Sequence, residues 1–183
     1  MTDIYFMIGP TNVGKTTFAE HVLEFPGTTA VFVGKELRAK YGEDYFKGQA
    51  APEHTEAESL SIMDAKIIEG LTAGSSIIMV DGQPRSDNQV KYICDHYPGG
   101  HNYRSWFLVF HCSDEMRRAR LEKRDTTKAK RDLALSRFYG DMPQIYKTVY
   151  TLVINGLSDR IILVNTGEEE NLDLILKTTN RNI

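Results

Sequence analysis

Five short apolar runs alternate along the chain with longer segments in which apolar and polar residues are mixed. The runs cover residues 4–8, 30–33, 77–80, 106–110 and 161–164. Each run is apolar throughout, which is typical of strands whose two faces are both covered by other layers. Between the runs, apolar residues recur at the spacing of one helix face, as they do at Ala57, Leu60, Met63 and Ile67 and at Val90, Ile93 and Tyr97. The pattern predicts a three-layer α/β fold, in which helices cover both faces of a five-stranded parallel sheet.

The composition is that of an ordinary globular protein, and we expect one domain over residues 1–183. Hydrophobic residues make up 41% of the chain and charged residues 26%, and no apolar run is long enough to cross a bilayer. The first residues lack the basic stretch of a secretory signal, so we expect a cytoplasmic protein with no membrane partner. The net charge of −3 argues against a stable nucleic-acid partner. We also expect a monomer, with Cys94 and Cys112 as reduced thiols.

The first apolar run leads directly into the segment GPTNVGKTT, which satisfies the phosphate-loop pattern GxxxxGK[ST] between a strand and a helix. In such a loop the backbone N–H groups point at phosphate oxygens, the lysine reaches the β- and γ-phosphates, and the following hydroxyl can hold Mg²⁺. A glycine-rich turn without a ligand is the alternative, but spacing, residue types and position all favour the phosphate loop. The predicted ATP-binding residues are Gly9, Pro10, Thr11, Asn12, Val13, Gly14, Lys15, Thr16 and Thr17.

The third apolar run ends in Asp81, where an acidic residue can support Mg²⁺ together with Thr16. An aspartate after a strand is also common as a helix or turn cap, so this position alone is weak evidence. It opens the segment DGQPRSDNQ, residues 81–89, which makes the metal-binding interpretation stronger.

This segment resembles the D-G-F/Y-P-R signature of the adenylate kinase family of nucleoside monophosphate kinases, with the glutamine that follows it in adenylate kinases. Gln83 stands where the family has an aromatic residue. Gly34 to Arg38, GKELR, looks like the family's G-D-x-L-R, which supplies an arginine to the phosphate of the acceptor nucleotide. The resemblance implies that the acceptor is bound by Gly34, Arg38, Gly82, Arg85 and Gln89.

The segment RLEKR, residues 120–124, is similar to the R-x-x-x-R pair at the start of the family's lid. Arg131 and Arg137 are candidates for the arginine pair that follows the lid, and Arg120 is also expected to contact ATP. A solvated basic face balanced by nearby acidic residues is the alternative interpretation, and it is the one we favour for Arg117 and Arg118. The resemblance therefore implies a catalytic set made of Lys15, Arg85, Arg120, Arg124, Arg131 and Arg137.

The predicted lid differs from that of the family, and the role of the aromatic residues in the predicted insert is open. The predicted lid, residues 124–131, is shorter than the family's short form, which predicts either more wasteful ATP hydrolysis or shielding of the site by the acceptor-binding insert. The predicted helical acceptor-binding insert, residues 27–70, contains Tyr41, Tyr45 and Phe46. These rings could stack a base, although packing in a small core is favoured.

The resemblance implies an enzyme that uses Mg²⁺ and transfers the γ-phosphate of ATP to a nucleoside monophosphate. AMP or dAMP is favoured if Gln89 reads the base, but Gln89 could equally be an exposed helix residue. One alternative is a phosphate-loop kinase for another small molecule or a nucleic-acid 5′-hydroxyl, which would not need the two acceptor motifs. The other is a non-catalytic nucleotide-binding regulator, which predicts the loss of charged positions that are present here.

Overall fold

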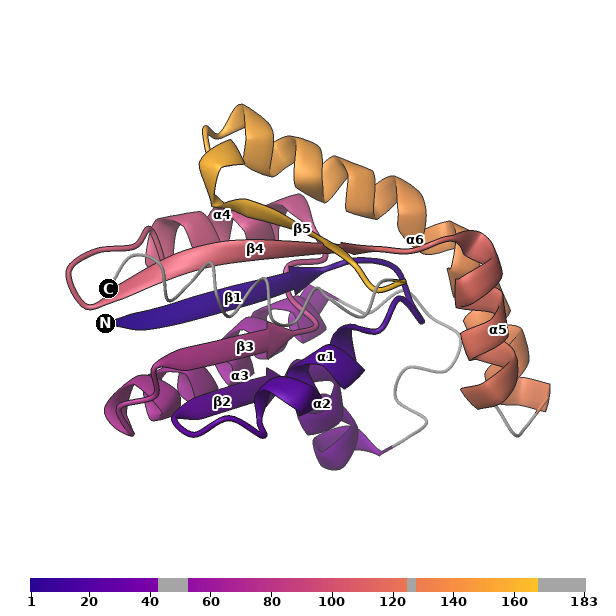
Figure 1. The fold of residues 1–183 in the computed structure, drawn as a ribbon, viewed down its shortest axis with the longest axis horizontal. Coiled ribbons are helices and arrows are strands. Elements are labelled where there is room, and N and C mark those ends of the chain that lie inside the picture. The colour runs from indigo at the N-terminus through magenta and orange to yellow at the C-terminus, as the bar shows by residue number, and fades with distance from the viewer. Residues whose placement is uncertain (43–52, 125–127, 168–183) are drawn as a thin grey trace.

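The computed structural model describes residues 1–42, 53–124 and 128–167, and its centre is a parallel sheet (Figure 1). The described strands are β1 (Thr2–Ile8), β2 (Thr28–Phe32), β3 (Ile77–Asp81), β4 (Tyr103–His111) and β5 (Ile161–Asn165). They lie in the order β2-β3-β1-β4-β5, and every neighbouring pair is parallel. The predicted five-stranded parallel sheet is confirmed.

Helices cover both faces of this sheet, which makes three layers. The α-helices of the described chain are α1 (Lys15–Val22), α2 (Val33–Tyr41), α3 (Glu53–Thr72), α4 (Asp87–His96), α5 (Asp114–Arg124) and α6 (Lys128–Ile154). The core on one face includes residues of α1, and the core on the other includes residues of α2, α3, α4 and α6. The predicted three-layer arrangement is therefore confirmed. Among these helices none is both long and apolar enough to cross a membrane.

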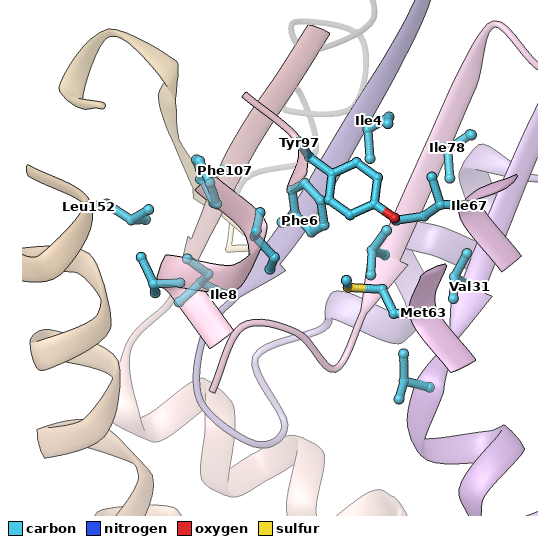
Figure 2. Packing of buried hydrophobic residues seen from close by; sticks show 14 of the residues in the cluster. Ile4, Phe6, Ile8, Val31, Met63, Ile67, Ile78, Tyr97, Phe107 and Leu152 are labelled. Carbon is cyan, nitrogen blue, oxygen red and sulfur yellow. The ribbon is translucent and has the colours of Figure 1, made fainter. Parts of the chain in front are cut away.

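The central strand β1 explains why the apolar runs do not alternate with polar residues. Its residues Ile4, Phe6 and Ile8 belong to the core beneath α3, α4 and α6, whereas Tyr5 and Met7 belong to the core beneath α1. Figure 2 shows the first of these cores, where the ring of Phe6 lies between those of Tyr97 and Phe107. Both faces of β1 are buried, so both must be apolar.

Some predicted boundaries shift in the structure. Val33 closes the second apolar run, but it opens α2 instead of ending β2. The predicted insert, residues 27–70, takes in β2, which pairs with β3 in the main sheet, together with α2 and most of α3. In the predicted lid region α5 ends at Arg124 and α6 begins at Lys128.

Several predicted features fall outside the described residues. These are the middle of the lid and the rings of Tyr45 and Phe46. Tyr41 is described, and its ring is 41% exposed while its hydroxyl donates to Glu58. The exposure of this ring does not fit the predicted packing role.

Candidate phosphate-transfer site

The carboxyl ends of β1 and β3 bring the phosphate loop and Asp81 to the same edge of the sheet. The two strands are neighbours, and Met7 of β1 is in register with Asp81 at the end of β3. The loop approaches β4 closely at Gly9, where a β-carbon would lie 2.9 Å from the carbonyl oxygen of Phe110. Only glycine fits this close approach of two backbones. The loop therefore begins where the sequence pattern predicts, and α1 follows it at Lys15.

The amine of Lys15 is bound by the loop itself. Its Nζ donates to the carbonyl oxygens of Gly9 at 2.6 Å and Pro10 at 2.9 Å. Burial lowers the pKa of Lys15 to about 8; Asp81 opposes this shift and Arg85 adds to it. Arg117 also lowers this pKa, and Asp141 raises it. The lysine is thus a buried cation that gains from any ligand that brings negative charge.

The two residues predicted to hold Mg²⁺ meet directly. Thr16 Oγ1 donates to Asp81 Oδ2 at 2.6 Å. A hydroxyl and a carboxylate oxygen are the hard ligands that Mg²⁺ prefers, so the pair fits this ion. No group of three or more histidine, cysteine or acidic residues gathers as a metal site within the described residues. An ion at Thr16 and Asp81 would therefore take its other ligands from phosphate oxygens and water.

The predicted acceptor residues come together from two elements. Gly34 and Arg38 lie one turn apart on α2, and a β-carbon on Gly34 would be 3.7 Å from Arg38 Nη1. Gly82 follows β3 with φ of +104°, and a β-carbon there would lie 3.7 Å from both Arg85 Nη2 and the backbone nitrogen of Gly34. A side chain at Gly82 would strain the backbone and crowd this contact. The two glycines thus allow α2 and the Arg85 loop to meet.

Gln89 forms hydrogen bonds at the N-terminus of its own helix, α4. Its Oε1 accepts from the backbone N–H of Arg85 at 2.5 Å, and its backbone N–H donates to the capping hydroxyl of Ser86 at 3.2 Å. The residue is only 6% exposed. The interpretation of Gln89 as an exposed helix residue is therefore wrong, while its proposed role in reading a base stays a prediction.

Arg120 joins the phosphate loop to the end of β5. Its guanidinium donates to Val13 O at 2.6 Å, and to Thr166 Oγ1 and O at 2.9 and 2.7 Å. Arg120 thus lies beside the predicted ATP-binding loop. Arg124 ends α5, and Arg131 and Arg137 belong to α6, but the side chains of these three lie outside the described residues.

Two residues that the sequence pattern does not single out also hold the loop. The prediction that Arg117 is a solvated surface residue is wrong, because this residue is only 2% exposed. Its guanidinium lies 4.0 Å from the ring centre of Phe138 and donates to Phe138 O at 2.7 Å and Thr11 O at 3.3 Å. Asp141 accepts from the backbone N–H and the hydroxyl of Thr11, at 3.1 and 2.5 Å.

The sequence contains a partial signal for only one of these two residues. Arg117 is one turn before Arg120, so the two share a helix face that points at the loop. Asp141 is 130 residues from Thr11, and no local pattern marks it. Arg118 is exposed, as predicted.

Comparison with known proteins finds similarity in structure only. No family model matches this sequence, and no curated protein matches it either. A chain in the Pnkp1/Rnl/Hen1 RNA repair complex aligns with a TM-score of 0.59 and 17% identity, over 81% of this chain and 45% of that one. An unliganded sugar kinase from Janibacter sp. HTCC2649 aligns with a TM-score of 0.63 and 15% identity, over 97% of this chain and 93% of that one. The chain therefore shares its three-layer α/β fold with these proteins.

Proposed function

We propose that this protein is a nucleoside monophosphate kinase, which transfers the γ-phosphate of ATP to AMP, dAMP or a related nucleotide. ATP would bind along residues 9–17, with its phosphates at Lys15. Thr16 and Asp81 would hold Mg²⁺. When bound, this ion would neutralise negative charge that develops on the phosphates during transfer. Arg38 and Arg85 would bind the phosphate of the acceptor.

The observation that carries the proposal is the meeting of two arginine-bearing segments beside the phosphate loop. The glycines that precede Arg38 and Arg85 lie against each other, and Arg85 is close enough to Lys15 to lower its pKa. Arginine grips two phosphate oxygens at once and stays charged, so a pair of arginines suits an ionised phosphate. An acceptor phosphate held there would face the γ-phosphate held at Lys15.

In this transfer the protein contributes mainly by positioning the two reactants and by supplying positive charge. An oxygen of the acceptor phosphate attacks the γ-phosphorus while the bond to the bridging oxygen breaks, and ADP leaves. The acceptor oxygen is already ionised near neutral pH, so no general base is needed. Arg120 would support the donor side through its bonds to Val13 and Thr166. Arg124, Arg131 and Arg137 would add positive charge over the transferred group.

A kinase for a hydroxyl acceptor is the second candidate, because one structural neighbour is a sugar kinase. Such an enzyme needs a base to take the hydroxyl proton. The two carboxylates that act on the pKa of Lys15 are those of Asp81 and Asp141, and each accepts a hydrogen bond from a loop hydroxyl. Two arginines at the acceptor position also favour an anionic acceptor. The monophosphate kinase is therefore the better supported function.

The test is an acceptor panel with Mg·ATP. The common ribo- and deoxynucleoside monophosphates, simple sugars and a 5′-hydroxyl oligonucleotide are each incubated with the protein and with Lys15→Ala. We expect ADP and the diphosphate of the acceptor in equal amounts, which for AMP means two ADP for each AMP consumed, and no product with Lys15→Ala. Phosphorylation of a sugar or oligonucleotide alone would replace the proposal with the second candidate. ADP without any phosphorylated acceptor would indicate an ATPase or regulator.

A further inference from the structure

The outer face of α6 is apolar and exposed near the carboxyl end of the helix. Tyr146, Tyr150, Val153 and Ile154 are 67%, 65%, 48% and 62% exposed, and they recur at the spacing of one helix face. The opposite face of the helix is buried and includes Leu152. Single exposed apolar side chains are normal, but four of them on adjacent turns form a patch.

This patch lies on the flank of α6 that faces away from α4. Lys147 Nζ lies 2.5 Å from the Asp87 carboxylate at the start of α4, and Thr151 Oγ1 donates to the same carboxylate at 3.3 Å. The flank of α6 with Lys147 and Thr151 therefore faces α4, and the patch lies on the other flank. Because α6 precedes β5 at the end of the sheet, the patch points toward the outer edge that β5 forms (Figure 1).

The strand at this edge adds one more exposed apolar side chain. β5 is the last strand in the sheet order, and its sequence IILVN carries no charge. Leu163 is 68% exposed and is in register with Val109, which packs against the core on the α6 side of the sheet. Proteins usually charge or cover such an apolar edge strand. We call the exposed apolar side chains at this edge the α6–β5 surface: Tyr146, Tyr150, Val153, Ile154 and Leu163.

We propose that the α6–β5 surface is the interface of a symmetric homodimer, in which two copies of this chain meet across a two-fold axis. This differs from the monomer expected from the sequence, and it does not depend on the proposed function. In such an interface both subunits use the same patch, so residues near the axis meet their own copies. No side chain of the surface is charged, and the nearby Lys147 is paired with Asp87 of its own chain. A second copy therefore opposes apolar groups without opposing like charges.

The exposed area fits a dimer of moderate affinity. A tyrosine offers about 150–250 Å² for burial, so the two tyrosines and three aliphatic side chains of the surface offer roughly 500 Å² together. Two copies would bury about 1,000 Å², which is the lower size limit of specific interfaces. We therefore expect a dissociation constant in the micromolar range.

The test measures the mass of the full chain by analytical ultracentrifugation at about 1–100 μM, the range in which a small interface should assemble. We expect the mass to rise with concentration from that of one 20.8 kDa chain toward twice that value. Ile154→Lys brings two like charges into the interface and should weaken dimerisation by about tenfold or more. Ile68→Lys is the matched control, because Ile68 lies on α3 and is 58% exposed; it should dimerise like the unmodified protein.

A mass of one chain over the whole range would overturn the proposal, and so would equal dimerisation of Ile154→Lys and the unmodified protein. Melting of dilute protein, in which the dimer has dissociated, separates a dimer interface from a surface covered by the chain itself. We expect the two lysine variants to change the melting temperature by similar small amounts. A monomeric protein in which only Ile154→Lys melts early would show that the chain covers this surface, against the proposal. The mass does not depend on activity, so failure of the kinase proposal would leave this result unchanged.

Discussion

Lys15 is a site residue whose pKa is shifted by the fold. It is bound to two loop carbonyls, and burial brings its pKa down to about 8. Bound phosphates stabilise the ammonium form and so raise this pKa again. Below about pH 8 the lysine of the free protein is already charged, and binding takes up no proton there. Above this pH, binding must bring a proton with it.

The affinity for ATP should therefore fall as the pH rises above about 8, by up to tenfold per pH unit until the pKa of the complex is reached. Calorimetry at pH 8 in buffers of different ionisation enthalpy should detect uptake of roughly half a proton per ATP. A constant dissociation constant between pH 7 and pH 9.5, without proton uptake, would contradict the shifted pKa.

Arg85 is the acceptor-side residue for which the proposed function predicts a large catalytic effect. Arg85→Ala should lower kcat by about 10³-fold, the lower end of the effect of a transition-state arginine in phosphoryl transfer. ATP affinity should change by less than about threefold, since Arg85 is assigned to the acceptor. Steady-state kinetics and ATP titration measure the two effects, and Arg118→Ala, an exposed arginine, is the control. Equal losses of ATP affinity and rate would contradict the assignment.

At the scale of elements, α6 is part of the phosphate loop's support. Asp141 accepts two hydrogen bonds from Thr11, and the carbonyl of Phe138 binds the guanidinium that also reaches Thr11 O. The backbone N–H and the carbonyl of Thr11 are therefore both bound by helices that lie more than 100 residues further along the chain. The same helix carries Arg131 and Arg137, so loop support and the candidate arginines share one element.

Asp141→Ala should raise the KM for ATP by about five- to tenfold and destabilise the protein by about 1–2 kcal/mol, because two donors of Thr11 lose their partner. Asp141→Asn keeps one acceptor oxygen and should recover much of both losses. Steady-state kinetics and denaturant unfolding measure these effects, with Asp159→Asn, an exposed aspartate, as control. An unchanged KM in Asp141→Ala would show that the loop keeps its geometry without the Asp141 contact.

The elements that could be predicted are those encoded locally. The strands are recognisable because both of their faces are buried, and the phosphate loop because its geometry depends on consecutive residues. The burial of Arg117 could not be predicted because it depends on the ring of Phe138, which lies 21 residues away, and the contact of Asp141 with Thr11 is more distant still. The burial of Gln89 could not be predicted either, because its position in the first turn of α4 does not reveal that its side chain accepts from the backbone N–H of Arg85.

At the scale of the whole molecule, the donor and acceptor residues come from different parts of the sheet edge. The loop after β1 leads to Lys15 at the start of α1, whereas α2 and the loop after β3 provide Arg38 and Arg85. The two ligands should therefore bind through largely separate sets of residues. Each should stabilise the fold on its own, by about 2.7 kcal/mol at a ligand concentration of 100 times its dissociation constant.

Arg38→Ala should remove most of the rise in melting temperature caused by AMP, and leave the rise caused by Mg·ATP within about 1 °C of the unmodified protein. The reason is that Arg38, beside Gly34 on α2, is assigned to the acceptor phosphate, whereas the phosphate loop is assigned to ATP. Differential scanning calorimetry measures both shifts, and Lys15→Ala should show the opposite pattern. Loss of both shifts in Arg38→Ala would indicate that the two sites do not act separately.

The position of β1 at the centre of the sheet has a consequence for how the protein is made. This strand is synthesised before both of its neighbours in the sheet, which begin only at residues 77 and 103, and Thr11 is anchored by a residue further on still. Pairings so distant in sequence form late and slowly. A nascent chain that has not yet reached residue 141 thus carries the whole phosphate-loop motif but lacks the Asp141 anchor of that loop. The phosphate loop thus becomes functional only well after it has been synthesised.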